Sequence, residues 1–103
     1  MGKITETRWG SYNVLFERSG CKIKTLHISP GKSLSDQRHF KRSEHWFILE
    51  GELCINGDLY HKNDFINIPV ENWHKTANIS NNECIVCEIQ YGDECIEEDI
   101  ERR

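Results

Sequence analysis

Four side chains of metal-ligand type stand at spacings that could bring them to one ion. Gln37 and His39 are two positions apart, so on a strand both project from the same face. Glu44 follows five positions later, within reach of a tight bend, and His74 comes from a distant segment. Two imidazole nitrogens with carboxylate and amide oxygens suit a divalent ion such as Zn²⁺, Mn²⁺, Fe²⁺, Co²⁺ or Ni²⁺. A mixed set of four protein ligands also leaves room for water or substrate, as a catalytic metal requires.

Each of these residues also has a simpler interpretation when taken singly. A single histidine on a strand is commonly a hydrogen-bonded core or surface residue, and no role is assigned to His27 or His61. Glutamine is not identified as a ligand by its chemistry alone. From the spacing by itself, a metal site and a set of unrelated polar residues are both open.

Short β-like runs separated by turn residues must position these side chains. Strands are expected over residues 12–17, 21–28, 45–49, 52–55, 58–61, 65–68, 73–79 and 84–91. Asn56-Gly57 lies between two of them and predicts a tight hairpin, because both positions tolerate positive φ. No window of 11 or more residues keeps a helical apolar period, except weakly at the C-terminus. The pattern predicts an all-β antiparallel fold: a sandwich, jelly roll or barrel.

Length and composition indicate one soluble domain over residues 1–103. The chain has 37% hydrophobic and 29% charged residues, ordinary values for a globular protein. No apolar run approaches the roughly 18–20 residues of a membrane span, and the first residues lack a signal-peptide core. We therefore expect a cytoplasmic protein without a membrane partner.

The charge distribution excludes one class of partner. The net charge is -4, and six of the nine residues from 93 to 101 are Asp or Glu. A nucleic-acid partner is not expected, because binders of that class carry a positive stripe that displaces counterions. The acidic segment is predicted to be a solvated terminus.

The five cysteines do not form the pattern of a disulfide framework. Their number is odd, and no export signal precedes them. Cys84 and Cys87 form a Cys-x-x-Cys within a strand-like run, where residues three apart point to opposite sides. Buried free thiols are therefore predicted, in preference to a redox or zinc pair.

Two segments resemble the two motifs of the cupin superfamily. The first motif is Gly-x5-His-x-His-x3-4-Glu-x6-Gly, and its positions hold Gly31, Gln37, His39, Glu44 and Gly51. The second is Gly-x5-Pro-x-Gly-x2-His-x3-Asn, and its last four named positions hold Pro69, Glu71, His74 and Asn78. The resemblance implies a single cupin-type β-barrel, also described as a double-stranded β-helix or jelly roll.

Almost the whole chain resembles the C-terminal cupin domain of type II mannose-6-phosphate isomerases. The resemblance is carried by residues 8–12, 30–37, 42–46 and 92–100. Mannose-6-phosphate isomerases hold zinc with a Gln-x-His pair, a Glu and a distant His, which accounts for Gln37. In the larger members this domain follows a nucleotidyltransferase domain, so the sequence corresponds to the isomerase half.

The implied reaction is reversible isomerisation of mannose 6-phosphate to fructose 6-phosphate through a cis-enediol. A metal ion, zinc by the resemblance, would polarise the carbonyl group while an acid or base moves a proton between C1 and C2. His45 stands beside Glu44 in the family motif and is one candidate for that proton transfer. Strand alternation points His45 away from its neighbour, so an outward or packing histidine is the other interpretation.

Three cations are candidates for binding the phosphate or steadying the enediolate. Arg42 and Lys32 flank the first motif, and plain solvation is the alternative for each. Arg8 is a weaker candidate, through its likeness to the family's Arg-x-Trp-Gly segment. The tryptophans are expected in the core or the pocket wall rather than as sugar-stacking platforms: Trp9, Trp46 and Trp73.

Two other functions are open. One is isomerisation or epimerisation of a different sugar phosphate on the same fold and metal. The other is a non-catalytic cupin that binds a sugar or nucleotide-sugar in a polysaccharide pathway. A dioxygenase is disfavoured, since such cupins usually keep three histidines. The resemblance also implies a homodimer.

Overall fold

The computed structural model describes residues 3–103, in which antiparallel strands form the whole framework. The first two residues of the predicted domain lie outside this range. The strands are β1 (Ile4–Thr7), β2 (Gly10–Arg18), β3 (Cys21–Ile28), β4 (Gln37–Arg38), β5 (Arg42–Glu50), β6 (Glu52–Ile55), β7 (Asp58–His61), β8 (Phe65–Ile68), β9 (Thr76–Ala77), β10 (Cys84–Gly92) and β11 (Glu101–Arg102). The all-β prediction is confirmed, and the weak helical period at the C-terminus gives no helix within residues 3–103.

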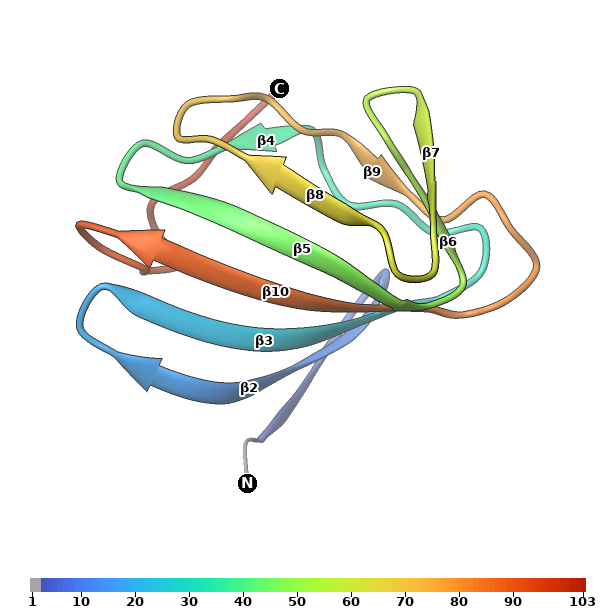
Figure 1. Cartoon of the computed structure of the whole chain (residues 1–103), viewed down its shortest axis with the longest axis horizontal. Coiled ribbons are helices and arrows are strands. Elements are labelled where there is room, and N and C mark those ends of the chain that lie inside the picture. Colours follow the sequence, from blue (N-terminus) through green and yellow to red (C-terminus); the bar gives the residue numbers. More distant parts are fainter. Residues whose placement is uncertain (1–2) are drawn as a thin grey trace.

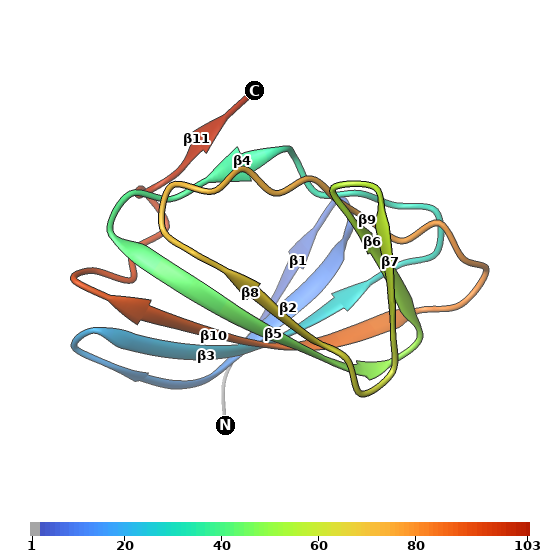
Figure 2. The same ribbon diagram turned by 45° about the horizontal axis from the view of Figure 1, so that its top comes forward.

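The strands form one large sheet and two small ones. The large sheet has six strands in the order β1-β2-β3-β10-β5-β8, and β10, β3 and β5 lie side by side in it (Figure 1). The small sheets are β7-β6-β9 and β11-β4, which lie across from the large sheet (Figure 2). Each described pairing is antiparallel. The curved sheets therefore enclose one interior between them.

The inner face of the large sheet is apolar at one end and polar at the other. Side chains alternate between interior and outer surface along β3, β5 and β10. At the apolar end, one row across these strands contains Leu26, Val86 and Ile48. The next two rows contain Lys24, Glu88 and Trp46, and then Lys22, Gln90 and Glu44. The hydrophobic core therefore fills one half of the interior, and polar groups surround the other half.

Most of the predicted strands are present, and three short ones were missed. Residues 21–28, 52–55, 58–61 and 65–68 are strands with the predicted bounds. The expected strand over 73–79 is reduced to β9, because only two of its residues pair with β6. The missed strands are β1, β4 and β11. Two of these have two residues each, which is too short for a periodic pattern to be recognised in the sequence.

The acidic segment near the C-terminus is folded against the polar end of the interior, so the prediction of a solvated terminus holds only in part: most of its acidic residues are exposed, but Asp99 is buried. Glu97 accepts a hydrogen bond from the buried Lys24 ammonium group at 2.8 Å. The buried Asp99 carboxylate accepts hydrogen bonds from the backbone N–H groups of Phe40 at 3.0 Å and Lys41 at 2.8 Å. The physical reason is that buried cations and backbone donors require partners, which the acidic segment supplies.

The hairpin predicted at Asn56-Gly57 is present between β6 and β7. Ile55 pairs with Asp58, and the two turn residues have φ angles of 52° and 86°. We expect Gly57→Ala to lower the free energy of unfolding by about 1 kcal/mol, because an L residue is strained at this φ. No atom lies within 4 Å of the added Cβ, so the cost is conformational. Chemical denaturation would measure it.

Gly57→Asn is the matched variant for this prediction. Asparagine tolerates left-handed backbone better than alanine, so its loss of stability should be smaller. Equal losses for the two variants would contradict the conformational explanation.

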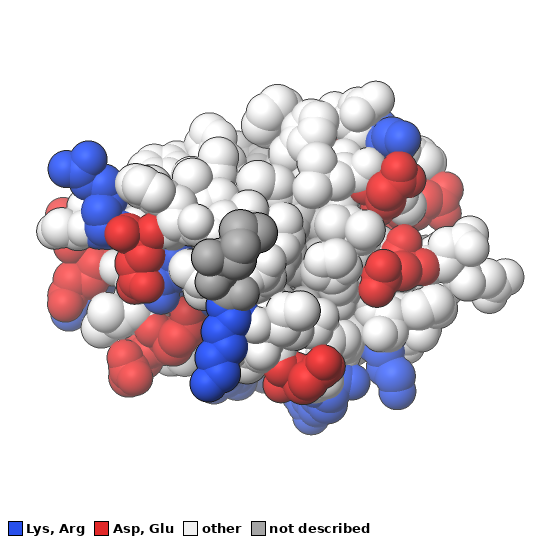
Figure 3. Space-filling view, turned by 90° about the horizontal axis from the view of Figure 1, so that it is seen from below, with Lys and Arg blue, Asp and Glu red and all other residues white. Residues whose placement is uncertain are grey.

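The expectations for the cysteines and for the distribution of charge can also be compared with the structure. The cysteines are free thiols, and Cys84 is buried while Cys87, on the other face of β10, is half-buried. On the face shown in Figure 3, charged side chains lie toward the two sides and along the lower edge, with basic and acidic groups mixed. Within residues 3–103, no helix has the length and apolar character needed to cross a membrane.

Candidate metal centre

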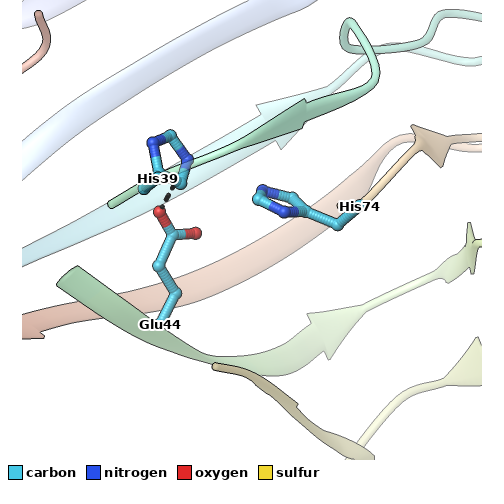
Figure 4. Close-up of side chains that lie close together, drawn as sticks. All are labelled: His39, Glu44 and His74. Atoms are coloured by element: carbon cyan, nitrogen blue, oxygen red, sulfur yellow. Dashed lines mark ion pairs between the residues drawn. The ribbon is translucent and has the colours of Figure 1, made fainter. Parts of the chain in front are cut away.

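Three of the four predicted ligands converge in the polar half of the interior. His39 follows β4, Glu44 lies on β5, and His74 lies between β8 and β9. One potential ligand atom from each lies within 4.8 Å of those from the other two. All three residues are buried, and Figure 4 shows their side chains directed toward one another. The grouping depends on segments 30 residues apart in the sequence, which the fold brings together.

Gln37 faces the same cavity as these three residues. Its backbone N–H donates to the His74 carbonyl at 3.2 Å, and the His74 N–H donates to the Gln37 carbonyl at 2.8 Å. This antiparallel bridge places the two residues beside each other, and both line the cavity. Arg38, between Gln37 and His39, instead lies over the Trp73 ring at 4.7 Å. The expected alternation along residues 37–39 is therefore observed.

Backbone carbonyl groups hold both imidazole rings in the form that a metal ion requires. His39 donates its Nδ1 hydrogen to the Asp99 carbonyl at 2.6 Å, and His74 donates its own to the Asn72 carbonyl at 3.2 Å. With Nδ1 protonated in both rings, each Nε2 atom is unprotonated and its lone pair can accept a metal ion or a hydrogen bond. Burial, with a smaller contribution from the Arg42 charge, lowers the pKa of His39 from 6.5 to about 4. Burial also lowers the pKa of His74, so both rings are neutral at neutral pH.

The Glu44 carboxylate is fixed by two neighbours on β5. Oε1 accepts a hydrogen bond from Trp46 Nε1 at 2.8 Å, and Oε2 accepts one from Arg42 Nε at 2.9 Å. The same Oε2 lies 3.2 Å from His39 Nε2. Arg42 also donates to the Ile96 carbonyl at 2.9 Å and to His39 Nε2 at 3.3 Å. The carboxylate is thus held in a single orientation with an oxygen beside the imidazole.

The donor set fits a borderline divalent ion. It offers two neutral imidazole nitrogens and a carboxylate within 4.8 Å of one another, with an amide side chain in the same cavity. Nitrogen donors with one carboxylate suit zinc or a neighbouring first-row ion better than Ca²⁺ or Mg²⁺, which take oxygen ligands. His39, Glu44 and His74 could therefore hold a divalent metal ion, with Gln37 as a possible fourth donor.

The four residues line a cavity of about 350 Å³. This volume is in the range of small-molecule sites in proteins. The cavity wall also includes the aromatic side chains of Trp9, Tyr12 and Trp46. Trp46 is fully buried and Trp9 packs against the core, as predicted for these two residues. The third tryptophan, Trp73, lies outside this cavity and is stacked by Arg38 and Arg103.

Several polar residues of the cavity were not recognised in the sequence. Glu88 is buried on β10, and desolvation, reinforced by the Glu44 charge, raises its pKa from 4.5 to about 8. Lys24 on β3 lies 4.3 Å from the centre of the Tyr12 ring and pairs with Glu97. The signal was available, because residues 22, 24, 88 and 90 occupy the buried positions of period-2 strands although all four are polar.

Two residues predicted at the catalytic site lie outside the cavity. His45 is on the outer face of β5, where its ring meets the Tyr91 ring edge-on at 5.2 Å. The reason is strand alternation: Glu44 points inward, so its neighbour points outward. Lys32 is exposed in the loop before β4 and does not line the cavity. Arg42, the third predicted residue, is buried beside Glu44 and does line it.

Comparison with known proteins shows a relation over the whole described chain. A family model described as "Mannose-6-phosphate isomerase C-terminal" matches residues 3–103. The alginate biosynthesis protein AlgA of Pseudomonas aeruginosa is 33% identical over 98 residues, which are 91% of this chain and 20% of that protein. The mannose-1-phosphate guanylyltransferase of Sinorhizobium fredii is 35% identical over 98 residues, 91% of this chain and 19% of that protein. The chain therefore spans about a fifth of the length of these relatives.

Solved structures share the fold at low sequence identity. The capsular polysaccharide assembling protein CapF of Staphylococcus aureus has a TM-score of 0.79 at 17% identity, covering 99% of this chain and 34% of that one. An RmlC-like cupin from Shewanella frigidimarina has a TM-score of 0.79 at 15% identity, covering 94% of this chain and 87% of that one. A cupin-superfamily sugar phosphate isomerase from Silicibacter pomeroyi has a TM-score of 0.68 at 15% identity, covering 78% and 59%. These likenesses confirm the predicted cupin fold.

Proposed function

This chain belongs to the family of mannose-6-phosphate isomerase C-terminal domains, and we propose on that premise that it is a metal-dependent isomerase of a sugar phosphate. The substrate pair we propose is mannose 6-phosphate and fructose 6-phosphate. The observation that carries the proposal is the convergence of His39, Glu44 and His74 on one point of a small-molecule cavity. A purely structural cluster would not need two neutral histidines beside a buried carboxylate.

The proposed cofactor is zinc, held by His39, Glu44 and His74 with Gln37 as the fourth ligand. When bound, the ion would polarise the substrate carbonyl and stabilise the negative charge that develops on its oxygen. The Asp99 and Asn72 carbonyl groups orient the two rings, and Trp46 and Arg42 orient the carboxylate. The chain's part in the reaction is thus to fix the ligand atoms in a site with little exposure to water.

The proposed reaction also requires a proton to move between C1 and C2 of the sugar. His45 cannot carry it, since its ring lies on the outer face of β5. Besides the proposed ligands, the ionisable side chains that line the cavity are Arg8, Tyr12, Lys24, Arg42, Glu88, Glu97 and Arg102. The acid or base of the proposed reaction therefore belongs to this set.

Zinc binding is expected to change little as the pH falls from about 7 to about 6. Protons compete with a metal ion only where they occupy Nε2. For His39 this competition sets in near pH 4 instead of 6.5, and the pKa of His74 is shifted in the same direction. The affinity should therefore be flat near neutral pH and fall only as the pH approaches these lowered pKa values. Competition with a chelator across this pH range would measure it. A steep loss that begins at pH 6.5 would contradict the assigned ligands.

The direct test is a coupled assay of mannose 6-phosphate conversion on chelator-treated protein, with and without added Zn²⁺, Mn²⁺ or Co²⁺. We expect turnover that depends on the added metal. Folded protein that binds zinc and converts no mannose 6-phosphate would overturn the isomerase assignment for this substrate. Other aldose phosphates would then be screened in the same format.

A non-catalytic role in binding a sugar or nucleotide-sugar is the second candidate. The observation that favours it is the outward position of His45, which leaves the cavity without the predicted proton carrier. Such a protein would bind ligand without turnover in the assay above. The homodimer implied by the resemblance stays a prediction, and sedimentation of the purified chain would test it.

A further inference from the structure

Most basic side chains of this chain are already paired with carboxylates. The sequence has thirteen Lys and Arg residues. Seven of them lie within 4.0 Å of a carboxylate oxygen: Lys22, Lys24, Arg38, Lys41, Arg42, Lys62 and Arg103. Within residues 3–103, the six without such a pair are Lys3, Arg8, Arg18, Lys32, Lys75 and Arg102. Any of these six has a charge available for an anionic ligand.

Two of the unpaired cations line the cavity of the candidate metal centre. Arg8 lies in the turn between β1 and β2, and Arg102 lies on β11, at the other end of the chain. Arg102 Nε donates to Ser35 Oγ at 3.2 Å, and Ser35 also lines the cavity. Both arginines are exposed, whereas His39, Glu44 and His74 are buried. The unpaired charges therefore lie at the mouth of the cavity and the proposed metal ligands in its interior.

The other two cations of the cavity wall are not available to an anion. The Lys24 ammonium group is buried and held by Glu97 at 2.8 Å. The Arg42 guanidinium group is buried between Glu44 and the Ile96 carbonyl. To recruit Arg42, a ligand would have to break a buried ion pair and leave the Glu44 carboxylate without this partner, which is strongly unfavourable. To recruit Lys24, a ligand would have to displace the Glu97 carboxylate from the buried ammonium group.

We infer that Arg8 and Arg102 form a phosphate subsite at the mouth of this cavity, which holds the phosphate monoester group of the ligand. Guanidinium groups match phosphate oxygens with paired N–H donors, and two of them balance the charge of a phosphate dianion. The subsite rests on the proposed function for the rest of the ligand, a sugar whose carbonyl end reaches the metal ligands.

This arrangement selects a class of substrate. A phosphate at the mouth and a reacting carbonyl in the interior require a sugar with the two groups at opposite ends. Aldose and ketose phosphates with a terminal phosphate ester satisfy this requirement, and sugar 1-phosphates do not. The subsite keeps Arg8, the weaker of the three candidates from the sequence, and replaces Lys32 and Arg42 with Arg102.

The test is calorimetric titration of the purified full chain, in excess zinc, with mannose 6-phosphate, mannose and inorganic phosphate. We expect Arg8→Gln and Arg102→Gln each to weaken mannose 6-phosphate binding by about tenfold, and the double variant by about a hundredfold. Binding of mannose should not change. Arg18→Gln is the matched control, because Arg18 is exposed, unpaired and outside the cavity. Inorganic phosphate should compete with mannose 6-phosphate in the wild type and lose this effect in the double variant.

The outcomes separate the subsite from the isomerase proposal. Arginine-dependent binding without turnover would support the subsite and overturn the isomerase. Turnover with a KM that is unchanged in the double variant would overturn the subsite and leave the isomerase standing. Wild-type protein that binds mannose and mannose 6-phosphate equally, or binds neither, would also overturn the subsite. Unfolding temperatures of the variants establish that a loss of binding is not a loss of fold.

Discussion

His74→Ala is expected to weaken zinc binding by a hundredfold or more and to abolish any metal-dependent turnover. The variant removes one of the two imidazole nitrogens of the proposed site. Loss of a residue that only orients a ligand typically costs about 10–100-fold in metal affinity, so loss of a ligand should cost at least the upper value. Zinc per chain, measured by plasma mass spectrometry after dialysis, and affinity from chelator competition would give the result.

His61→Ala is the matched control for this variant. The His61 side chain is 59% exposed, lies on β7 of the sheet β7-β6-β9, and does not line the cavity. The His61→Ala protein should bind zinc as the wild type does. Zinc stoichiometry and affinity that survive in a folded His74→Ala protein would refute the ligand assignment. If zinc is retained and turnover alone is lost, His74 acts on the substrate instead of the metal.

The common face of Gln37 and His39 could be predicted because it depends on local rules, whereas the distant His74 was placed beside them only by the resemblance to the cupin motifs. Residues two apart on a strand share a face, which places Gln37 and His39 together, and adjacent residues do not, which separates His45 from Glu44. Both consequences are observed in the structure. His45 was wrongly predicted at the catalytic site because its place in the family motif was given more weight than strand alternation, which points its side chain outward.

The groups that orient the ligands could not be predicted in the same way. The carbonyl that fixes the His39 ring comes from Asp99, 60 positions away, in a segment with no strand pattern. The position of this segment follows from the hydrogen-bond donors at residues 24, 40 and 41. Their need for partners becomes apparent only once the sheets are assembled. Local periodicity therefore predicts which face of a strand a side chain lies on, but not which distant segment supplies its hydrogen-bond partner.

The same distinction between local patterns and long-range partners explains which strands could be predicted. Most strands of four or more residues were predicted with correct bounds or nearly so, because several residues and the flanking turn signals contribute to one pattern. Strands β4 and β11 pair with each other through two residues each, and Gln37 of β4 also forms an isolated bridge with His74. Their existence depends on the folded acidic segment, which brings Glu101 and Arg102 beside Arg38 and Gln37.

Asp99→Ala is expected to lower the free energy of unfolding by about 2–4 kcal/mol and to weaken zinc binding by roughly tenfold. The carboxylate accepts hydrogen bonds from two backbone N–H groups, those of Phe40 and Lys41, and its removal leaves both donors without that partner. The same residue's carbonyl orients His39, so loosening the segment frees the imidazole ring. Chemical denaturation and chelator competition would measure the two effects.

Asp93→Ala is the control for this prediction, since Asp93 belongs to the same acidic segment and is exposed. It should change neither quantity appreciably, because a solvated carboxylate contributes little to stability. Asp99→Asn retains one acceptor oxygen and should fall between the wild type and Asp99→Ala. Equal behaviour of the Asp93 and Asp99 variants would mean that the acidic segment is solvated as first predicted, and that the His39 ring is oriented by other contacts. A stability loss without a change in zinc affinity would confine the role of Asp99 to the fold.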